Sequence, residues 1–136
     1  AGTENILGSL NGVFFTDANT SKPTFANHLL ASNAATDIVA LVNDSPLQQY
    51  EVRSNNTGAS AQLDVGNTAD IAYTAGSTAN FVSRCTLNDS TLNANAEQQI
   101  KVIGVSRDPE NNDLSAANVV WRVIVNQSFF NDLTGV

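Results

Sequence analysis

The chain has 136 residues and a formal net charge of −7 at pH 7, and only 14% of its residues are charged. A domain of this length can bury one core, and the apolar content of 42% excludes disorder throughout. Partners that present nucleic-acid phosphates or an anionic membrane surface are excluded, because they require clustered cations. The cations here are scattered: Lys22, Arg53, Arg84, Lys101, Arg107 and Arg122.

The first third of the chain predicts an extended start, two strands and one helix. We expect an N-terminal arm over residues 1–12 and strands over 12–17 and 35–44. The segment 23–32 predicts a short helix, since Thr24 can cap it and one face would gather three residues at helical spacing. Those residues are Phe25, Leu29 and Ser32.

The rest of the chain has short apolar segments separated by Gly, Asn and Asp turns, a pattern typical of all-β proteins. Strands are expected over 47–54, 61–66, 69–76, 79–87, 97–106 and 118–126. The last two are the strongest because β-branched residues alternate with polar ones, and Trp121 is the expected core anchor. We therefore predict an antiparallel β-sandwich of jelly-roll type or a barrel, formed as a single domain by residues 13–136.

Residues able to carry catalysis or bind a transition metal are few. The chain has one histidine, His28, and one cysteine, Cys85, which we place in the middle of the strand over 79–87. A zinc site needs three or four convergent ligands, and a Cys–His pair would have to meet in space. Phosphate-binding glycine loops and a nucleophile elbow are missing. We predict no enzyme and no cofactor; a hydrolase using two carboxylates is the alternative.

The polar loop between the two strongest strands contains three acids. Asp108, Glu110 and Asp113, with the amides of Asn111 and Asn112, offer oxygen ligands of the kind that Ca²⁺ prefers. The EF-hand order is not met, and Asp-Pro and Asn-Asn-Asp are ordinary turn sequences. The loop over 106–115 therefore has two interpretations: a calcium site, or the solvated tip of a hairpin, which we favour.

The composition of the surface suits contact with other subunits. The chain has 18 Asn, 12 Ser and 12 Thr, and neutral polar side chains lose less solvation than charged ones when they are buried. One cysteine cannot form an intrachain disulfide, and the first ten residues lack the pattern of a signal peptide. We expect synthesis in a reducing cytoplasm, and no apolar run reaches the ~20 residues of a membrane span.

The carboxy-terminal third, "QIKVIGVSRDPENNDLSAANVVWRVIVNQSFF", is similar to a segment of small head proteins of tailed bacteriophages. In both, a strand, an acidic polar loop, an "AAN" or "GAN" turn and a final strand follow one another. The matching residues are Val102–Val105, Asp108–Asn112, Ala116–Asn118 and Val119–Val125.

This resemblance implies a virion protein, made in the host cytoplasm, that decorates and cements a capsid by binding across major capsid protein subunits. It also implies an oligomer or lattice neighbours. The N-terminal arm would order on a neighbouring subunit through Ile6, Leu7 and Leu10; the alternative is a frayed terminus. Other interpretations are a tail or receptor-binding module and a lattice-forming coat protein. The charge of −7 argues against a coat protein that packages RNA.

Overall fold

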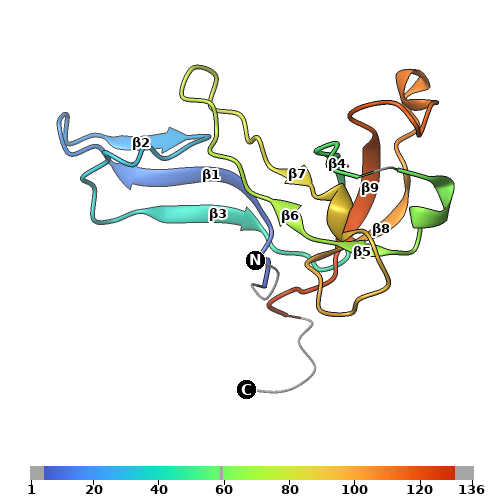
Figure 1. Cartoon of the computed structure of the whole chain (residues 1–136). Helices are drawn as coiled ribbons and strands as arrows, with labels where there is room; N and C mark the ends of the chain where they lie inside the picture. The colour runs from blue at the N-terminus through green and yellow to red at the C-terminus, as the bar shows by residue number, and fades with distance from the viewer. Residues whose placement is uncertain (1–4, 59, 131–136) are drawn as a thin grey trace.

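The computed structural model describes residues 5–58 and 60–130, and the regular elements there are strands and short 3-10 turns. The strands form three antiparallel sheets, so the all-β prediction is confirmed, although no closed barrel is formed among these residues. Two parts are visible in Figure 1: a body built on a four-stranded sheet, and a three-stranded sheet that projects to one side.

The body is built on the strand order β4-β9-β8-β5. Its strands are β4 (Gln49–Arg53), β5 (Thr68–Ala69), β8 (Ile100–Val105) and β9 (Val120–Val125). One face is apolar because alternate residues of each strand point to it, and the buried Trp121 pairs with Val52 on one side and Val105 on the other. The predicted strand pair and its core anchor are thus confirmed.

Short elements complete the core of the body. The strands β6 (Ile71–Ala72) and β7 (Thr86–Leu87) form a two-stranded sheet, and the fully buried Leu87 belongs to the same apolar cluster as Trp121. The 3-10 turns are η1 (Gln62–Asp64), η2 (Asp89–Thr91) and η3 (Pro109–Asn111). Burying this cluster provides the main driving force for folding of the body.

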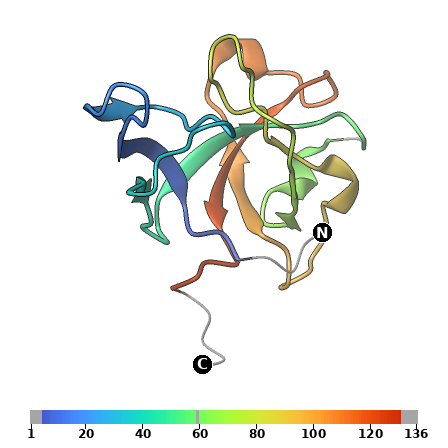
Figure 2. The same cartoon turned by 90° about the vertical axis from the view of Figure 1, so that its left-hand side faces the viewer.

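We call the projecting three-stranded sheet the lateral sheet. It consists of β1 (Ser9–Thr16), β2 (Pro23–Ala26) and β3 (Val39–Asn43) in the order β2-β1-β3. Figure 2, turned by 90°, looks at the molecule from the side of the lateral sheet. The lateral sheet therefore has far less of its surface covered by the rest of the chain than the body sheet has.

The prediction of a helix over residues 23–32 is wrong. Pro23–Ala26 is strand β2, which pairs with β1 so that Phe25 lies opposite Phe14. The i, i+4 spacing of Phe25 and Leu29 indicated a helix, but the sequence has no core-facing stripe long enough to support one. Antiparallel pairing with β1 satisfies the backbone instead.

Three predicted strands in the middle of the chain are absent or shorter than expected. Residues 61–66 contain the turn η1, in which Asp64 accepts a hydrogen bond from the backbone N–H of Ala61 (2.7 Å). The strand over 69–76 ends after Ala72, and of 79–87 only Thr86–Leu87 forms a strand. Side chains that bond to the nearby backbone, such as Asp64, Ser77 and Ser83, compete with sheet pairing in these segments.

Candidate functional site

The most prominent surface is one face of the lateral sheet. Phe14 pairs with Phe25 on one side and with Val39 on the other, and Leu41 pairs with Gly12 two residues along. Because residues that pair directly or lie two apart share a face, these apolar side chains point the same way. We call Phe14, Phe25, Val39 and Leu41 the apolar face; their exposed fractions are 45%, 61%, 53% and 48%.

Because Gly12 has no side chain, the ring of Phe25 can lie directly on the backbone of β1. A Cβ placed on Gly12 would lie 2.4 Å from the ring carbon Cζ of Phe25, so the ring rests directly on the glycine. A larger residue would lift the ring away and open the face. The glycine thus provides a flat contact between β1 and the side chain of β2.

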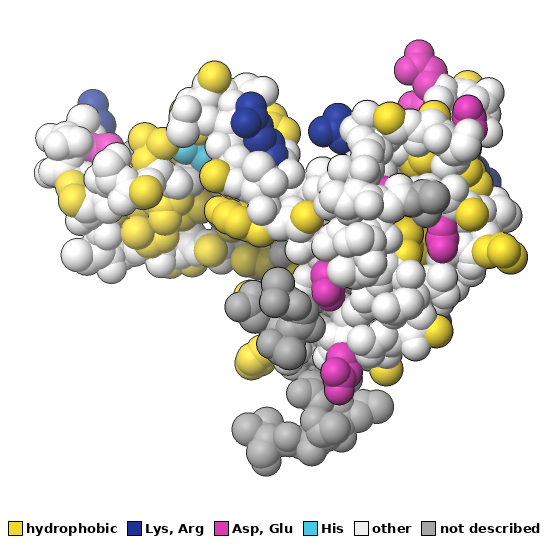
Figure 3. Space-filling model, in the orientation of Figure 1, with side chains coloured by type: hydrophobic (Ala, Val, Ile, Leu, Met, Phe, Trp, Pro, Cys, Tyr) yellow, Lys and Arg dark blue, Asp and Glu magenta, His cyan; other side chains and the backbone are white. Residues whose placement is uncertain are grey.

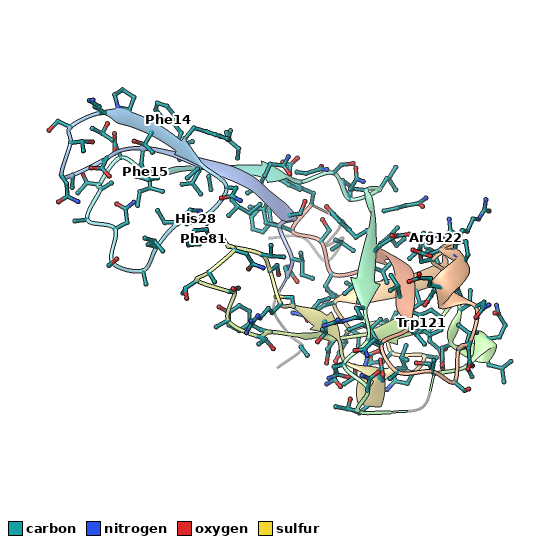
Figure 4. All side chains as sticks on the ribbon, turned by 90° about the horizontal axis from the view of Figure 1, so that it is seen from above. Phe14, Phe15, His28, Phe81, Trp121 and Arg122 are labelled. Carbon is teal, nitrogen blue, oxygen red and sulfur yellow. The ribbon has the colours of Figure 1, made fainter. Side chains whose placement is uncertain are left out.

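The opposite face of the lateral sheet is covered by its own loops. Val13 and Phe15 are buried there, and the ring of His28 stacks on Phe81 with centroids 3.6 Å apart. Figure 4 shows Phe14 projecting from β1 on the side away from Phe15, His28 and Phe81. The stack joins the loop after β2 to the loop between β6 and β7, so this face is partly internal and the apolar face is free.

The structure does not assemble the residues that the sequence offered for catalysis. His28 places Nδ1 2.7 Å from Oδ1 of Asn27, and no hydrogen bond joins it to Cys85 in the described part of the chain. Cys85 is half-buried and precedes β7 instead of lying within a strand. Phe81 and Val82, expected in a strand, are exposed in the loop.

Two of the three acids of the 106–115 loop, Asp108 and Asp113, bond within the loop. Asp108 accepts a hydrogen bond from the backbone N–H of Glu110 (3.0 Å), and Asp113 accepts from the backbone N–H and hydroxyl of Ser115 (2.9 and 2.7 Å). The Ser115 hydroxyl and N–H lower the pKa of Asp113. No group of three or more His, Cys, Asp or Glu side chains in residues 5–58 and 60–130 is arranged to hold a metal.

Asn111, in the same loop, connects the loop to β9. Its side-chain amide donates to the carbonyl of Val120 (2.8 Å), and its side-chain oxygen accepts from the N–H of the same residue (2.9 Å). This two-bond contact fixes the base of the hairpin between β8 and β9. The loop thus has the local geometry of a hairpin connection.

The three residues expected to anchor the N-terminal arm differ in their burial. Ile6 donates its N–H to the carbonyl of Gln127 (2.8 Å) and packs against the core, whereas Leu7 and Leu10 are exposed. Residues 9–12 belong to β1, and residues 1–4 lie outside the described chain. Partner binding by Ile6, Leu7 and Leu10 stays a prediction.

A polar network that the sequence analysis missed joins three loops of the body. Asn56 donates to Oδ1 of Asn118 (3.1 Å) and accepts from the backbone N–H of Asn118, while Asn55 and Thr57 bond to Asn88. Asn56 and Asn118 both have positive φ, 57° and 64°, which asparagine tolerates better than most residues. The turn sequences "NN" and "AAN" were the features of the sequence that could have indicated this network.

Asp89 lies at the centre of this network, 5% exposed. Its Oδ2 accepts from the backbone N–H of Asn56 (3.1 Å), and Oδ1 is buried with no hydrogen-bond partner among the described residues. Burial raises the pKa of the Asp89 carboxyl, against the lowering effect of the nearby Ser54 hydroxyl and of the Asn56 N–H. A shallow cavity lined by Asn56, Asp89 and Ser115 adjoins it.

We expect the substitution Asp89→Asn to remove a pH dependence of stability. Because the folded-state pKa of Asp89 is raised, its carboxyl costs no stability below the unfolded-state pKa, and stability falls as pH rises from there through the folded-state pKa. Equilibrium unfolding in urea across pH 3 to 7 should show the variant gaining stability relative to wild type over that interval.

The control for this experiment is Asp89→Ala. It also removes the titrating carboxyl, but unlike asparagine it leaves the Asn56 N–H without an acceptor, so it should be less stable than Asp89→Asn by about 1–3 kcal/mol at every pH. Asp17, Asp37 and Asp113 have lowered pKa values, so their contribution is lost only as pH falls below the ordinary range of aspartate. A constant difference between Asp89→Asn and wild type over the whole range would contradict the prediction.

No family model, curated protein or solved structure matches this chain. The residues described contain no helix of the length and apolarity needed to cross a bilayer. The surfaces described above thus have to be interpreted from their own chemistry. They comprise a free apolar face and a polar network.

Proposed function

We propose that this protein is a virion structural protein that decorates and cements a capsid lattice by binding across major capsid protein subunits. In this proposal the apolar face of the lateral sheet is the main contact. The observation that carries it is the exposure of Phe14, Phe25, Val39 and Leu41 side by side on a projecting sheet. The similarity of the carboxy-terminal third to phage head proteins supports the capsid as partner.

The extent of exposed apolar surface supports a protein partner. Sixteen large apolar side chains of the described residues are exposed, and eight of them lie between Leu10 and Leu41. The four residues of the apolar face expose on the order of 300–400 Å², since each aromatic ring alone offers 150–250 Å². Contiguous apolar patches of this size on soluble proteins commonly mark interaction sites.

The distribution of charge also favours the lateral sheet as the contact. Between residues 9 and 43 the charged side chains are Asp17, Lys22 and Asp37, which leave −1 of the total −7. Figure 3, which shows the side of the lateral sheet that carries His28 and not the apolar face, places most of the acidic side chains in view on the body. A partner docking on the lateral sheet desolvates few charges, which lowers the cost of binding.

A lattice partner explains how a contact of this size can be sufficient. A single patch of this area gives modest affinity, but copies that bridge neighbouring subunits reinforce a shell through many repeated contacts. In this proposal the body, packed around the buried Trp121, is the rigid part.

The test is binding to capsids of the particle from which the protein derives, after removal of the native copies. We expect the double variant Phe14→Ser and Phe25→Ser to lose at least about tenfold in affinity in a cosedimentation assay, because aromatic anchors dominate interface energies. The matched control is Leu63→Ser, which removes a side chain that is 90% exposed on the body.

Two results would overturn the proposal. One is wild-type protein that does not sediment with the stripped capsids at any concentration. The other is binding that the double variant retains at wild-type strength while its circular dichroism stays native. Saturable binding to tails and not to heads would instead identify a tail module.

A further inference from the structure

Strand β3 is an unguarded edge of the lateral sheet. It pairs with β1 on one side only, and no described residue pairs with its other side. An edge strand presents alternate N–H and C=O groups that have no partner in the sheet, and these can accept a further strand. Val39–Asn43 therefore offers a row of backbone groups to another chain.

The other edges in the described chain are shorter, partly covered or charged. In the body sheet, a bridge from Ser54 to Leu87 covers only the end of β4, whose edge also carries Glu51 and Arg53, and a bridge from Thr68 to Asn93 covers β5. In the lateral sheet, β2 is four residues long and begins with Pro23, which has no N–H to donate. Shortness, proline and covering segments are the usual protection against unwanted pairing, and β3 has none of them.

The sequence along β3 is complementary to itself. Residues 38–42 read "IVALV", with the small Ala40 at the centre, a large aliphatic residue on either side of it, and another beyond each. In an antiparallel pair centred on Ala40, Val39 lies opposite Leu41 of the second copy, and Ala40 lies opposite Ala40. Each cross-strand pair then joins apolar side chains, which is the arrangement that stabilises a sheet.

We propose that two copies of this protein associate through β3 about a two-fold axis. The strands pair antiparallel, so the two lateral sheets become one continuous sheet. An interface with the same strand on both sides is the self-complementary kind that closes a dimer. The apolar faces of the two copies then join, since Val39 and Leu41 from both chains lie on the same side of the pair.

Electrostatics favour a second copy meeting at this edge. Two chains of net charge −7 repel each other, and the repulsion is weakest where the parts that approach carry least charge. Residues 38–43 carry no charge, whereas β4 on the body contains Glu51 and Arg53. This inference is independent of the capsid partner, because pairing uses the backbone edge and capsid binding uses the side chains of the apolar face.

The experiment measures the mass of the full chain in solution by sedimentation equilibrium, from low to high micromolar concentration. We expect a monomer–dimer equilibrium for wild type and a loss of dimer in Ala40→Lys, since a charge in the middle of an edge strand opposes pairing. Hydrogen exchange on wild type provides a second readout. Amides of residues 39–42 that face outward should become protected as concentration rises, and those of β2 should not.

Cysteine cross-linking provides a matched control. Ala40 and Ala26 flank Val13 on the two sides of β1 and point to the same face. With Cys85→Ser as background, Ala40→Cys should form a disulfide-linked dimer under mild oxidation, and Ala26→Cys, on the guarded edge, should not. A wild-type chain that is monomeric at every concentration, a dimer that persists in Ala40→Lys, or equal cross-linking at both positions would overturn the proposal.

Discussion

Replacing Trp121 by alanine should cost about 3–5 kcal/mol of folding free energy, the range found when large aromatic residues are removed from cores. Trp121 is completely buried and stands between β4 and β8 in the body sheet, in contact with the cluster that includes Val102 and Leu87. Small domains have total stabilities of about 5–15 kcal/mol, so the variant should be close to unfolding at 37 °C.

The control for this prediction is Trp121→Phe. The indole Nε1–H of Trp121 is buried with no acceptor among the described residues, so phenylalanine removes an unsatisfied donor along with one ring. We expect it to cost clearly less than alanine. Because Trp121 is the only tryptophan, unfolding has to be followed by circular dichroism. Equal costs for the two variants would show that packing of the indole is not the main contribution.

The second large effect is expected for Gly8→Ala, on the order of 3 kcal/mol, from backbone strain and overpacking together. Gly8 has a φ of 152°, and a Cβ there would lie 1.9 Å from the carbonyl oxygen of Asn43. The clash is with backbone, so the pairing of Ser9 with Asn43 has to open. The position connects Ile6, packed on the body, to the lateral sheet.

The variant Gly66→Ala separates backbone strain from overpacking, the two causes of the cost expected for Gly8→Ala. Gly66 also has a positive φ, 102°, but a Cβ there would meet nothing within 4 Å. Its cost should be about 1–2 kcal/mol from conformation alone. Thermal unfolding of both variants provides the comparison, and Gly8→Ala should have the lower melting temperature. The reverse order would mean that the contact between Gly8 and Asn43 is readily relieved.

The effect of Gly8→Ala on the amide exchange of the lateral sheet is also informative. If residue 8 holds β1 against β3, amides of Val39–Asn43 should exchange faster in the variant, while those of β8 and β9 stay protected. Local opening of this kind costs less than global unfolding. Such a result would show that the lateral sheet depends on this junction and the body does not.

The all-β fold class could be predicted from the sequence because apolar and polar residues alternate in a strand that packs one face on a core. In β8 and β9 the apolar residues alternate over a whole strand, so Ile100–Val105 and Val120–Val125 were expected within a few residues of their bounds. The "NND" and "DP" turn signals placed the loop between them, and Trp121 as the core anchor followed from its position in an alternating strand.

Short segments could not be assigned in the same way. Pro23–Ala26 contains a single aromatic residue and could satisfy a helical or an extended pattern; its pairing with β1, about ten residues earlier, decided it. Residues 61–87 depend on contacts with more distant segments, such as the bond from the backbone N–H of Ile71 to Oε1 of Gln99, 28 residues later. Local propensity is too weak to choose between such alternatives without the partner segment.

The sequence alone determined that this protein is an all-β chain with a sparsely charged surface and a core anchored by Trp121. Alternation of side chains and the scarcity of charge act along the chain, so they can be read locally. Only the tertiary structure decided that Phe14, Phe25, Val39 and Leu41 form an exposed face and that β3 is a free edge. Those properties depend on which strands pair and on what covers them, and pairing between distant segments is not encoded in any one of them.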